Sequence, residues 1–426
     1  MGPRAGSPLN RRLFLRLLAG AALSRRTSAA MRLRVTVAGA GIIGASIAYH
    51  LAKAGATVTV IDRAGPATHA SRGSFAWINA TWSKQPRAYH ALNQAGVARW
   101  KTLRPELKLP ARWGGSLEGH AIADARGELA ARVAEQVAWG ETTRFVDIAG
   151  LSALEPNVDF SGLSHVIHSA NDGATDPVAA TQAFLGAASA LGAIVRYPCE
   201  LTGLVLSRNR LSAVQTSRGE IPTDRLVLAT GAATDAGKRF ADWDVPMQDA
   251  PGATAITAPM PRLVERVLWM PDIHLHQRDD GRIVLGEEGG PPRDEAHAER
   301  LRHHPNDFPA REIALQHAER MRAVAQHYVP RLTNVTFENA FVCWRPMPLD
   351  GYPVLGASPA RRDVYIAVMH SGVTLAPIVG ELAAHEVMEE GDSERLKDFR
   401  PDRTFSQAAV AGTWGTAFAT RRSNRA

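Results

Sequence analysis

The chain is poor in cysteine and in long apolar runs. It has two cysteines, Cys199 and Cys343, among 426 residues. Two cysteines cannot build a disulfide scaffold, and they do not supply the ligand set of a zinc site. Beyond residue 30, no stretch is long and apolar enough to cross a bilayer. We therefore expect no integral membrane segment, and we expect a globular chain long enough for more than one compact unit.

The main body of the chain also lacks an excess of positive charge. The net charge of +7 is concentrated at the two ends, because residues 1–30 contain six arginines and no acid, and residues 421–426 contain three more arginines. Residues 31–420 therefore carry a net charge of −2. A basic nucleic-acid-binding surface is not supported by this distribution, and we expect no nucleic-acid partner.

Residues 1–30 have two interpretations. Arg11 and Arg12 followed by the short apolar run 17–23 resemble a twin-arginine export leader, which would place the protein in the periplasm. The run is only seven residues long, and Met31 lies two residues before the first expected strand. We favour an upstream extension that precedes a start at Met31, and hence a cytoplasmic protein, with the periplasm as the alternative.

The most informative stretch of the chain is a glycine-rich turn between a strand and a helix. Gly39, Gly41 and Gly44 form a GxGxxG pattern after an expected strand at 33–38, and Asp62 lies at the end of a second strand, 23 positions after Gly39. The first glycine permits the sharp turn, the second permits close approach to a phosphate, and the third lets the helix pack against the sheet. The helix N-terminus would hold a pyrophosphate, and the carboxylate would hold a ribose. The motif predicts dinucleotide binding without separating NAD from FAD.

Later segments indicate that this α/β unit is interrupted. A strand at 225–229, apolar throughout its last four residues, leads into the turn at Gly231, and another small-residue strand and helix follow from 364 onward. Between them, residues 245–340 show β-type alternation, broken by a polar helical stretch at 294–327. We expect a mixed α/β and α+β fold, in which a discontinuous Rossmann-like domain carries an inserted β-rich substrate domain.

The expected domain limits follow from these changes in pattern. A leader or extension occupies 1–30, and a tail occupies 401–426. The nucleotide-binding domain comprises 31–85, 145–245 and 340–400, and the substrate domain comprises 86–144 and 246–339.

Several separated motifs together resemble the FAD-dependent D-amino-acid oxidase superfamily, which includes glycine oxidase, sarcosine oxidase and D-amino-acid dehydrogenase. The resemblance covers nearly all of residues 31–400. It is carried by the glycine turn and by the following segments: Ser71–Ser74, Leu154–Pro156, Asp172–Pro177, Leu228–Ala232, Arg345–Pro346 with Asp350–Gly356, and His370–Thr374.

The resemblance implies FAD held non-covalently across the interrupted domain. The expected cofactor-binding residues are Gly39, Ala40, Gly41, Ile43, Gly44, Asp62, Arg63, Ser71, Arg72, Gly73, Ser74, Leu201, Gly231, Gly372, Val373 and Thr374. The turn Gly372–Thr374 precedes a helix, and the dipole of that helix would stabilise negative charge on the reduced flavin. No metal site is expected. Only one GxGxxG turn is present, so electrons are expected to enter from an organic substrate rather than from NAD(P)H.

Arg345 is the residue expected to bind substrate. It lies before a proline at a strand end, and in similar proteins the arginine of this Arg-Pro pair holds the substrate carboxylate. The expected reaction is hydride transfer from the α-carbon of a small amino acid or secondary amine to flavin N5, giving an imine that hydrolyses. Such chemistry needs positioning more than a protein base.

Other side chains are secondary candidates. His274, His276 and His370 lie near the expected site, and Trp77, Trp113, Trp269 and Trp344 could line an aromatic pocket. Cys343 precedes Asp350 by seven positions, the spacing of the flavin-linked cysteine in sarcosine-oxidase-like proteins, although a buried structural thiol is favoured.

The sequence leaves several partners open. Electrons would leave to O2, a quinone or a carrier protein. The chief alternative function is a flavin-binding subunit of a hetero-oligomeric dehydrogenase with little activity alone. A tRNA-base-modifying flavoprotein is disfavoured by the charge of the main body.

Overall fold

The computed structural model describes residue 2 and residues 32–81, 84–121, 127–233, 235–248, 250–287, 311–389 and 391–406. The expected leader, apart from Gly2, and residues 407–426 of the expected tail therefore lie outside the described residues. So does the part of the expected helical stretch 294–327 that precedes residue 311.

The nucleotide-binding part is built on a six-stranded sheet with the order β19-β20-β13-β1-β2-β9. Its strands are β1 (Arg34–Ala38), β2 (Thr57–Ile61), β9 (Ile194–Arg196), β13 (Arg225–Leu228), β19 (Val354–Ala357) and β20 (Val364–Val368). All neighbours pair in parallel except β19, which is antiparallel to β20. The central strands are almost wholly buried, because helices cover the sheet.

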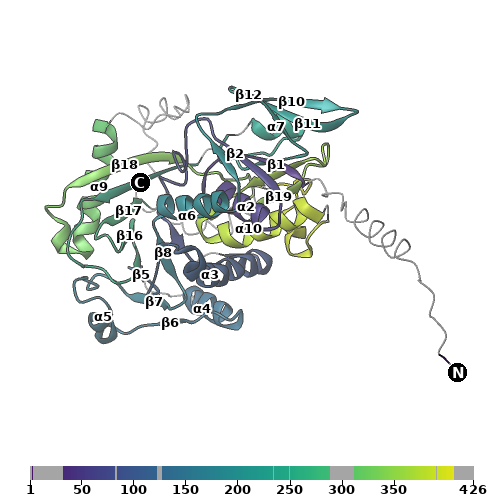
Figure 1. Ribbon diagram of the computed structural model, residues 1–426. Helices are drawn as coiled ribbons and strands as arrows, with labels where there is room; N and C mark the ends of the chain where they lie inside the picture. Colours follow the sequence, from purple (N-terminus) through teal and green to yellow (C-terminus); the bar gives the residue numbers. More distant parts are fainter. Residues whose placement is uncertain are drawn as a thin grey trace.

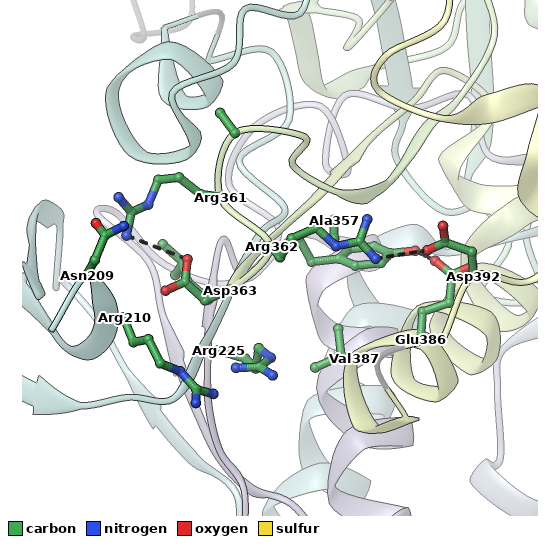
Figure 2. A pocket seen from close by; sticks show the side chains of 13 residues that line it. Asn209, Arg210, Arg225, Ala357, Arg361, Arg362, Asp363, Glu386, Val387 and Asp392 are labelled. Carbon is green, nitrogen blue, oxygen red and sulfur yellow. Dashed lines mark hydrogen bonds and ion pairs between the residues drawn. The ribbon is translucent and has the colours of Figure 1, made fainter. Parts of the chain in front are cut away.

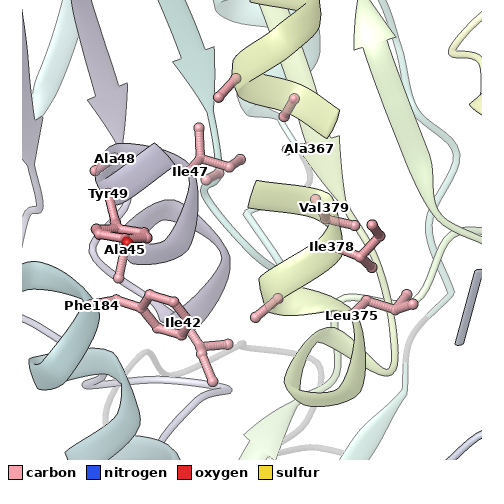
Figure 3. Packing of buried hydrophobic residues seen from close by; sticks show 14 of the residues in the cluster. Ile42, Ala45, Ile47, Ala48, Tyr49, Phe184, Ala367, Leu375, Ile378 and Val379 are labelled. Carbon is pink, nitrogen blue, oxygen red and sulfur yellow. The ribbon is translucent and has the colours of Figure 1, made fainter. Parts of the chain in front are cut away.

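Helices α2 (Ile42–Lys53), α6 (Pro177–Ala190) and α10 (Gly372–Glu389) pack together over this sheet. Figure 3 shows Ile42 and Ile47 of α2 between Phe184 of α6 and the apolar side chains of α10. Burial of these side chains fixes the start of α2 against the start of α10, which are the two helix ends at the candidate site.

The β-rich part is built on an eight-stranded sheet with the order β18-β14-β17-β16-β15-β5-β7-β6. Its strands are β5 (Ser116–His120), β6 (Thr143–Phe145), β7 (His165–Ser169), β14 (Pro251–Thr257), β15 (Val267–Met270), β16 (Ile273–Gln277), β17 (Ile283–Glu287) and β18 (Phe337–Trp344). Helix α9 (Arg311–Tyr328) packs against β14, β16, β17 and β18. Figure 1 shows this sheet and α9 on one side of the molecule and the parallel sheet on the other.

Two three-stranded sheets accompany the two larger ones. One three-stranded sheet contains β3 (Trp77–Ile78), β8 (Gly173–Thr175) and β4 (Ala111–Trp113), and another contains β10 (Leu201–Ser207), β11 (Arg210–Thr216) and β12 (Gly219–Pro222). The other helices of the described residues are α3 (Arg87–Leu107), α4 (Glu128–Ala138), α5 (Ile148–Leu154), α7 (Ala236–Ala241) and the short 3-10 turns at Pro330–Leu332 and Glu394–Phe399. Within the described part of the chain, no helix is long and apolar enough to span a membrane.

The strands divide the chain differently from the expected domain limits. Strand β7 belongs to the eight-stranded sheet, although we expected 145–245 to lie in the nucleotide-binding domain. Strand β18 also belongs wholly to that sheet, although we expected the nucleotide-binding part to resume at 340.

Helix α3, which we expected in the substrate domain, packs against α10 of the nucleotide-binding part. A Cβ on Gly96 of α3 would lie only 2.5 Å from the Thr374 carbonyl oxygen, and the Trp100 indole donates to the Val373 carbonyl at 2.8 Å. Alternation along a strand does not reveal its partner strand, and a helix period does not reveal which layer the helix covers.

Candidate functional site

The glycine turn has the geometry that the sequence predicts. Gly39 has a φ of 110°, and a Cβ there would lie 2.2 Å from the Ala229 carbonyl oxygen. A Cβ on Gly44 would lie 2.0 Å from the Gly39 carbonyl oxygen, so only glycine lets α2 approach the turn this closely. A Cβ on Gly41 would meet only the Ser71 hydroxyl, at 3.1 Å. The turn therefore places the start of α2, where the first backbone N–H groups of a helix have no intrahelical partner, beside the cavity that Gly41 lines.

Asp62 directly follows β2 and lies beside this turn. One carboxylate oxygen accepts from the Ala40 N–H at 2.8 Å, and the other accepts from the Ala64 and Gly65 N–H groups at 2.9 Å each. A carboxylate has about four acceptor sites, so these three bonds fix its orientation and leave capacity for a hydroxyl group. The geometry suits the expected contact with a ribose.

The loop Ser71–Ser74 closes over the start of α2. The Ser71 hydroxyl accepts from the Ile42 N–H at 3.0 Å. Gly73 packs against Cys343, where a Cβ would lie 2.3 Å from Sγ. The Arg72 guanidinium lies over the Phe341 ring at 4.9 Å. The loop is thus fixed from both sides and crosses the region where a pyrophosphate would lie.

Two adjoining cavities run along these elements. The first, of about 450 Å³, is lined by Gly39, Asp62, Arg63 and Leu201 among others. The second, of about 250 Å³, extends to Arg345 and Gly372. The residues that line both are Gly41, Ala70, Ser71, Ala229, Gly231, Cys343 and Trp344. The two cavities therefore form one elongated space from the end of β2 to the start of α10.

The start of α10 closes the far end of this space. Ser371 has a φ of 58°, and Gly372, Val373 and Thr374 form the first turn of the helix and line the second cavity. The Thr374 hydroxyl donates to the Trp77 carbonyl and accepts from the Asn79 N–H, each at 3.2 Å. The helix start thus presents backbone N–H groups and its positive dipole end to the cavity.

These features fit FAD as the cofactor. A diphosphate would lie at the start of α2, with a ribose at Asp62, and a flavin ring would reach the start of α10. Fourteen expected residues line the cavities: Gly39, Gly41, Ile43, Asp62, Arg63, Ser71, Gly73, Ser74, Leu201, Gly231, Arg345, Gly372, Val373 and Thr374.

Three expected cofactor residues do not line either cavity. Ala40 is buried and bonds Asp62, Gly44 packs on the turn, and Arg72 lies over Phe341. Direct contact between these three and the cofactor stays a prediction.

Arg345 follows the last residue of β18, as its Arg-Pro position predicts. Its backbone N–H continues the pairing to the Ala250 carbonyl at 2.9 Å, and its Nε and Nη2 donate to the carbonyls of Ala250 and Pro251 at 3.2 and 3.1 Å. Gly252 lies under the side chain, because a Cβ there would be 3.5 Å from the arginine Cδ. These contacts fix a guanidinium at the wall of the second cavity.

An aromatic group forms another wall of the second cavity. Trp269 stacks on His274, with ring centroids 4.6 Å apart, and Trp77 lies 5.4 Å from Trp269. Trp344 also lines this cavity, whereas Trp113 does not. The cavity therefore has a largely apolar, sterically fixed side.

The three candidate histidines are neutral. Burial lowers the pKa of His274 and of His276 to about 3, and it holds the pKa of His370 well below its usual range. His274 and His370 line the second cavity, whereas His276 bonds the Phe75 carbonyl at 2.8 Å and does not. A neutral imidazole has no net charge that would repel the ammonium group of a substrate or attract its carboxylate.

Cys343 lies between the two cavities, but its thiol is poorly activated. Burial raises its pKa to about 12, so the thiolate needed for covalent attachment is scarce near neutral pH. This favours non-covalent FAD. Within the described residues, no cluster of His, Cys, Asp and Glu could hold a metal ion.

A buried polar group beside the second cavity was not predicted from the sequence. Lys84 lines the cavity and donates to the Ser371 hydroxyl at 3.0 Å, and the Tyr89 hydroxyl lies 2.9 Å from the same oxygen. Asp172 lies behind it, fully buried, and burial raises its pKa to about 7. Asp172 belongs to a motif that carries the family resemblance, but Lys84 belongs to none, so no sequence signal marked it.

A third cavity, of about 370 Å³, lies at the opposite end of the parallel sheet. Figure 2 shows the arginines and the acids that line it, and one of these arginines is Arg225 at the start of β13. Arg361 pairs with Asp363 at 3.6 Å, and Arg362 pairs with Asp392 at 3.5 Å. Since this cavity lies at the N-terminal ends of the strands, away from the glycine turn, it is not the nucleotide site.

The family profile described as FAD dependent oxidoreductase matches residues 34–386. The chain belongs to this family of FAD-dependent oxidoreductases. FAD is therefore its cofactor, as the geometry of the elongated cavity also indicates.

Individual relatives are similar over most of their length. The chain is 24% identical to the glycine oxidase of Bacillus licheniformis over 380 residues, which cover 86% of this chain and 96% of the relative. It is 25% identical to the hydrogen cyanide synthase subunit HcnC of Pseudomonas aeruginosa over 405 residues, covering 84% and 92%.

A solved structure shares the fold. The glycine oxidase from Geobacillus kaustophilus superposes with a TM-score of 0.77 at 19% identity and covers 88% of this chain and 100% of that chain. The expected Rossmann-like domain with a β-rich part is confirmed by this similarity.

Proposed function

We propose that this FAD-dependent oxidoreductase oxidises the C–N bond of a small amino acid or secondary amine. The observation that carries the proposal is the placement of Arg345. Its guanidinium lies in the wall of the same cavity that the start of α10 closes. A planar guanidinium is suited to bidentate binding of a carboxylate. The relatives named glycine oxidase support an amino-acid substrate.

The protein would contribute position and a dry environment. Arg345 would hold the carboxylate while Trp269 and His274 form an apolar wall, so the substrate's Cα–H would have one permitted direction. When bound, FAD supplies the oxidant that removes hydride from this carbon, and the nitrogen lone pair forms the C=N bond that water later hydrolyses. The neutral histidines support a reaction without a protein base, in which the amine binds in its unprotonated form.

Anaerobic titration tests this function. FAD-loaded protein would be titrated with glycine, N-methylglycine, D- and L-alanine and proline while the flavin absorbance is followed. We expect at least one of these amino acids to bleach the flavin. In Arg345→Leu, bleaching should need about a hundredfold more substrate, because a charge-assisted bidentate bond contributes about 2–3 kcal/mol.

The control is Arg345→Lys, which keeps the charge but loses the planar guanidinium. The substrate concentration that it needs for bleaching should lie between those of wild type and Arg345→Leu. All three proteins should retain FAD. Loss of FAD in Arg345→Leu would mean that Arg345 holds the cofactor. Failure of every amino acid to bleach the wild-type flavin would overturn the proposed reaction.

A second candidate is a flavin-binding subunit that needs a partner for turnover. The similarity to HcnC, which is named as a subunit, supports this second candidate. The two candidates differ in steady-state turnover of the isolated chain with O2, a quinone or a dye acceptor. Full turnover alone would reject the subunit hypothesis, whereas flavin bleaching without turnover would support it.

A further inference from the structure

Lys84 is a buried cation with little compensation from the protein. The residue is 6% exposed and lines the second cavity. Its ammonium donates to the Ser371 hydroxyl at 3.0 Å and lies 5.4 Å from the centre of the Tyr89 ring. An ammonium has three N–H donors, and among the described residues only this hydroxyl accepts from it. A buried charge is costly unless it is paired, so the arrangement points to an acceptor that enters the cavity.

The nearest acid does not fill this role. Asp172 exerts a favourable Coulomb effect on Lys84, but among the described residues the ammonium forms no ion pair with it. One oxygen of Asp172 accepts from Trp77, Thr81 and Ser116 at 3.2, 2.8 and 2.6 Å. Asp172 is thus held by its own donors on the far side of the cavity wall, and the cavity does not include it.

Lys84 and Arg345 both line the second cavity and exert their charge on the same part of it. His370 precedes α10 by two residues and lines the second cavity, and its pKa is held low by burial and then by both Arg345 and Lys84. Two cations therefore lie within electrostatic reach of one imidazole. The acid in this cavity lining, Glu287, is paired with Arg320 of α9. The described lining thus carries an excess of positive charge.

We propose that Lys84 binds a second carboxylate of the substrate, so that the preferred substrate is an amine bearing two carboxylates. The inference rests on the proposed function, in which Arg345 holds the first carboxylate. With its amine unprotonated, as the reaction requires, such a substrate has a net charge of −2, which complements the two cations. Iminodiacetate and aspartate are suitable probes, because each adds one carboxylate to a molecule of otherwise similar size.

The preference for two carboxylates should depend on pH. Burial lowers the pKa of Lys84 to about 8, so its positive charge is present below this pH and is lost above it. The groups that face Lys84 are Asp172, Tyr89 and His370. Asp172 ionises near pH 7, the pKa of Tyr89 is raised to about 12, and His370 stays neutral. None of them supplies a replacement cation above pH 8.

The test compares wild type with Lys84→Met and with the exposed-surface control Lys101→Met. Apparent dissociation constants for anaerobic flavin reduction are measured for iminodiacetate against N-methylglycine and for D-aspartate against D-alanine, at pH 7 and pH 9.5. Binding of malonate against acetate, read from the flavin difference spectrum, adds a measurement that needs no turnover.

We expect wild type to bind each dicarboxylate at least tenfold more tightly than its matched monocarboxylate at pH 7. A hydrogen bond to a charged group supplies such a factor. The preference should vanish in Lys84→Met and fall at pH 9.5, whereas Lys101→Met should resemble wild type. Lys84→Arg should keep part of the preference at pH 9.5, because arginine stays charged.

Three results would overturn the inference. One is equal binding of mono- and dicarboxylates by wild type. Another is an equal loss for both classes in Lys84→Met, which would place Lys84 against the cofactor. A third is loss of FAD from that variant. If no amine bleaches the flavin, the proposed function fails, and the malonate comparison still decides the role of Lys84.

Discussion

The two ends of the elongated cavity are built in different ways. At the nucleotide end, the helix start and the carboxylate that would hold the diphosphate and the ribose both come from the contiguous segment 39–62, and the loop 71–74 closes over them. At the substrate end, they are side chains such as Lys84, Trp269 and Arg345, from segments far apart in the chain. The first end is fixed by local turn geometry, whereas the second depends on how two sheets are placed against each other. We therefore expect changes at the first end to affect FAD binding and stability, and changes at the second to affect substrate choice.

The largest effect is expected from Gly39→Ala. The added Cβ would lie 2.2 Å from the Ala229 carbonyl oxygen, at a φ of 110°. Strain and overpacking together should cost about 3 kcal/mol or more, and FAD should be lost. FAD content and the urea midpoint measure this.

Gly55→Ala is the matched control for Gly39→Ala. It has a φ of 95° but open space around the Cβ position. It should cost only the backbone strain and should keep FAD. Retention of FAD by Gly39→Ala would contradict the assignment of the turn.

Changes at the substrate end should leave FAD in place. Arg345→Leu should raise the substrate concentration needed for flavin reduction about a hundredfold. Lys84→Met should remove the at least tenfold preference for dicarboxylates. The two ends would not be independent if either variant lost FAD at the same time.

Asp172→Asn is expected to change how stability depends on pH. The folded-state pKa of Asp172 is raised from 3.8 to about 7, so folding favours its protonated form. The contribution of the protonated Asp172 carboxyl to the free energy of unfolding is complete below about pH 4 and is lost as pH rises through 7. The variant should gain stability relative to wild type between pH 5 and pH 8. Urea midpoints at these two pH values measure the change, and a difference that is independent of pH would contradict it.

The smallest effect is expected from Cys343→Ala. The thiol is buried beside Phe341 and Gly73, and losing its contacts should cost about 1 kcal/mol while FAD stays bound. Intact mass under denaturing conditions should show the unmodified wild-type chain. A mass increase equal to FAD that disappears in Cys343→Ala would instead prove covalent attachment.

The contrast between the two ends also explains what the sequence could predict. Gly39, Gly44 and Asp62 were predictable, because turn geometry and helix packing depend on neighbours in the chain. Arg345 and Gly372 were predictable only through the family resemblance, which supplies the long-range arrangement.

Lys84 and the placement of β7 and α3 could not be predicted in this way. Their roles depend on contacts with Ser371, β5 and α10, and neither alternation nor helix period encodes such partners. An isolated lysine two residues before a proline also suggests an exposed loop residue, although the fold buries it.

Equilibrium binding of FAD to the apoprotein tests the central claim most directly. Wild type and Arg345→Leu should each take up one FAD per chain with dissociation constants within about twofold of each other, while Gly39→Ala should take up none. Failure of wild type to bind FAD, or a large loss of FAD affinity in Arg345→Leu, would contradict the account of one cavity with a nucleotide end and a separate substrate end.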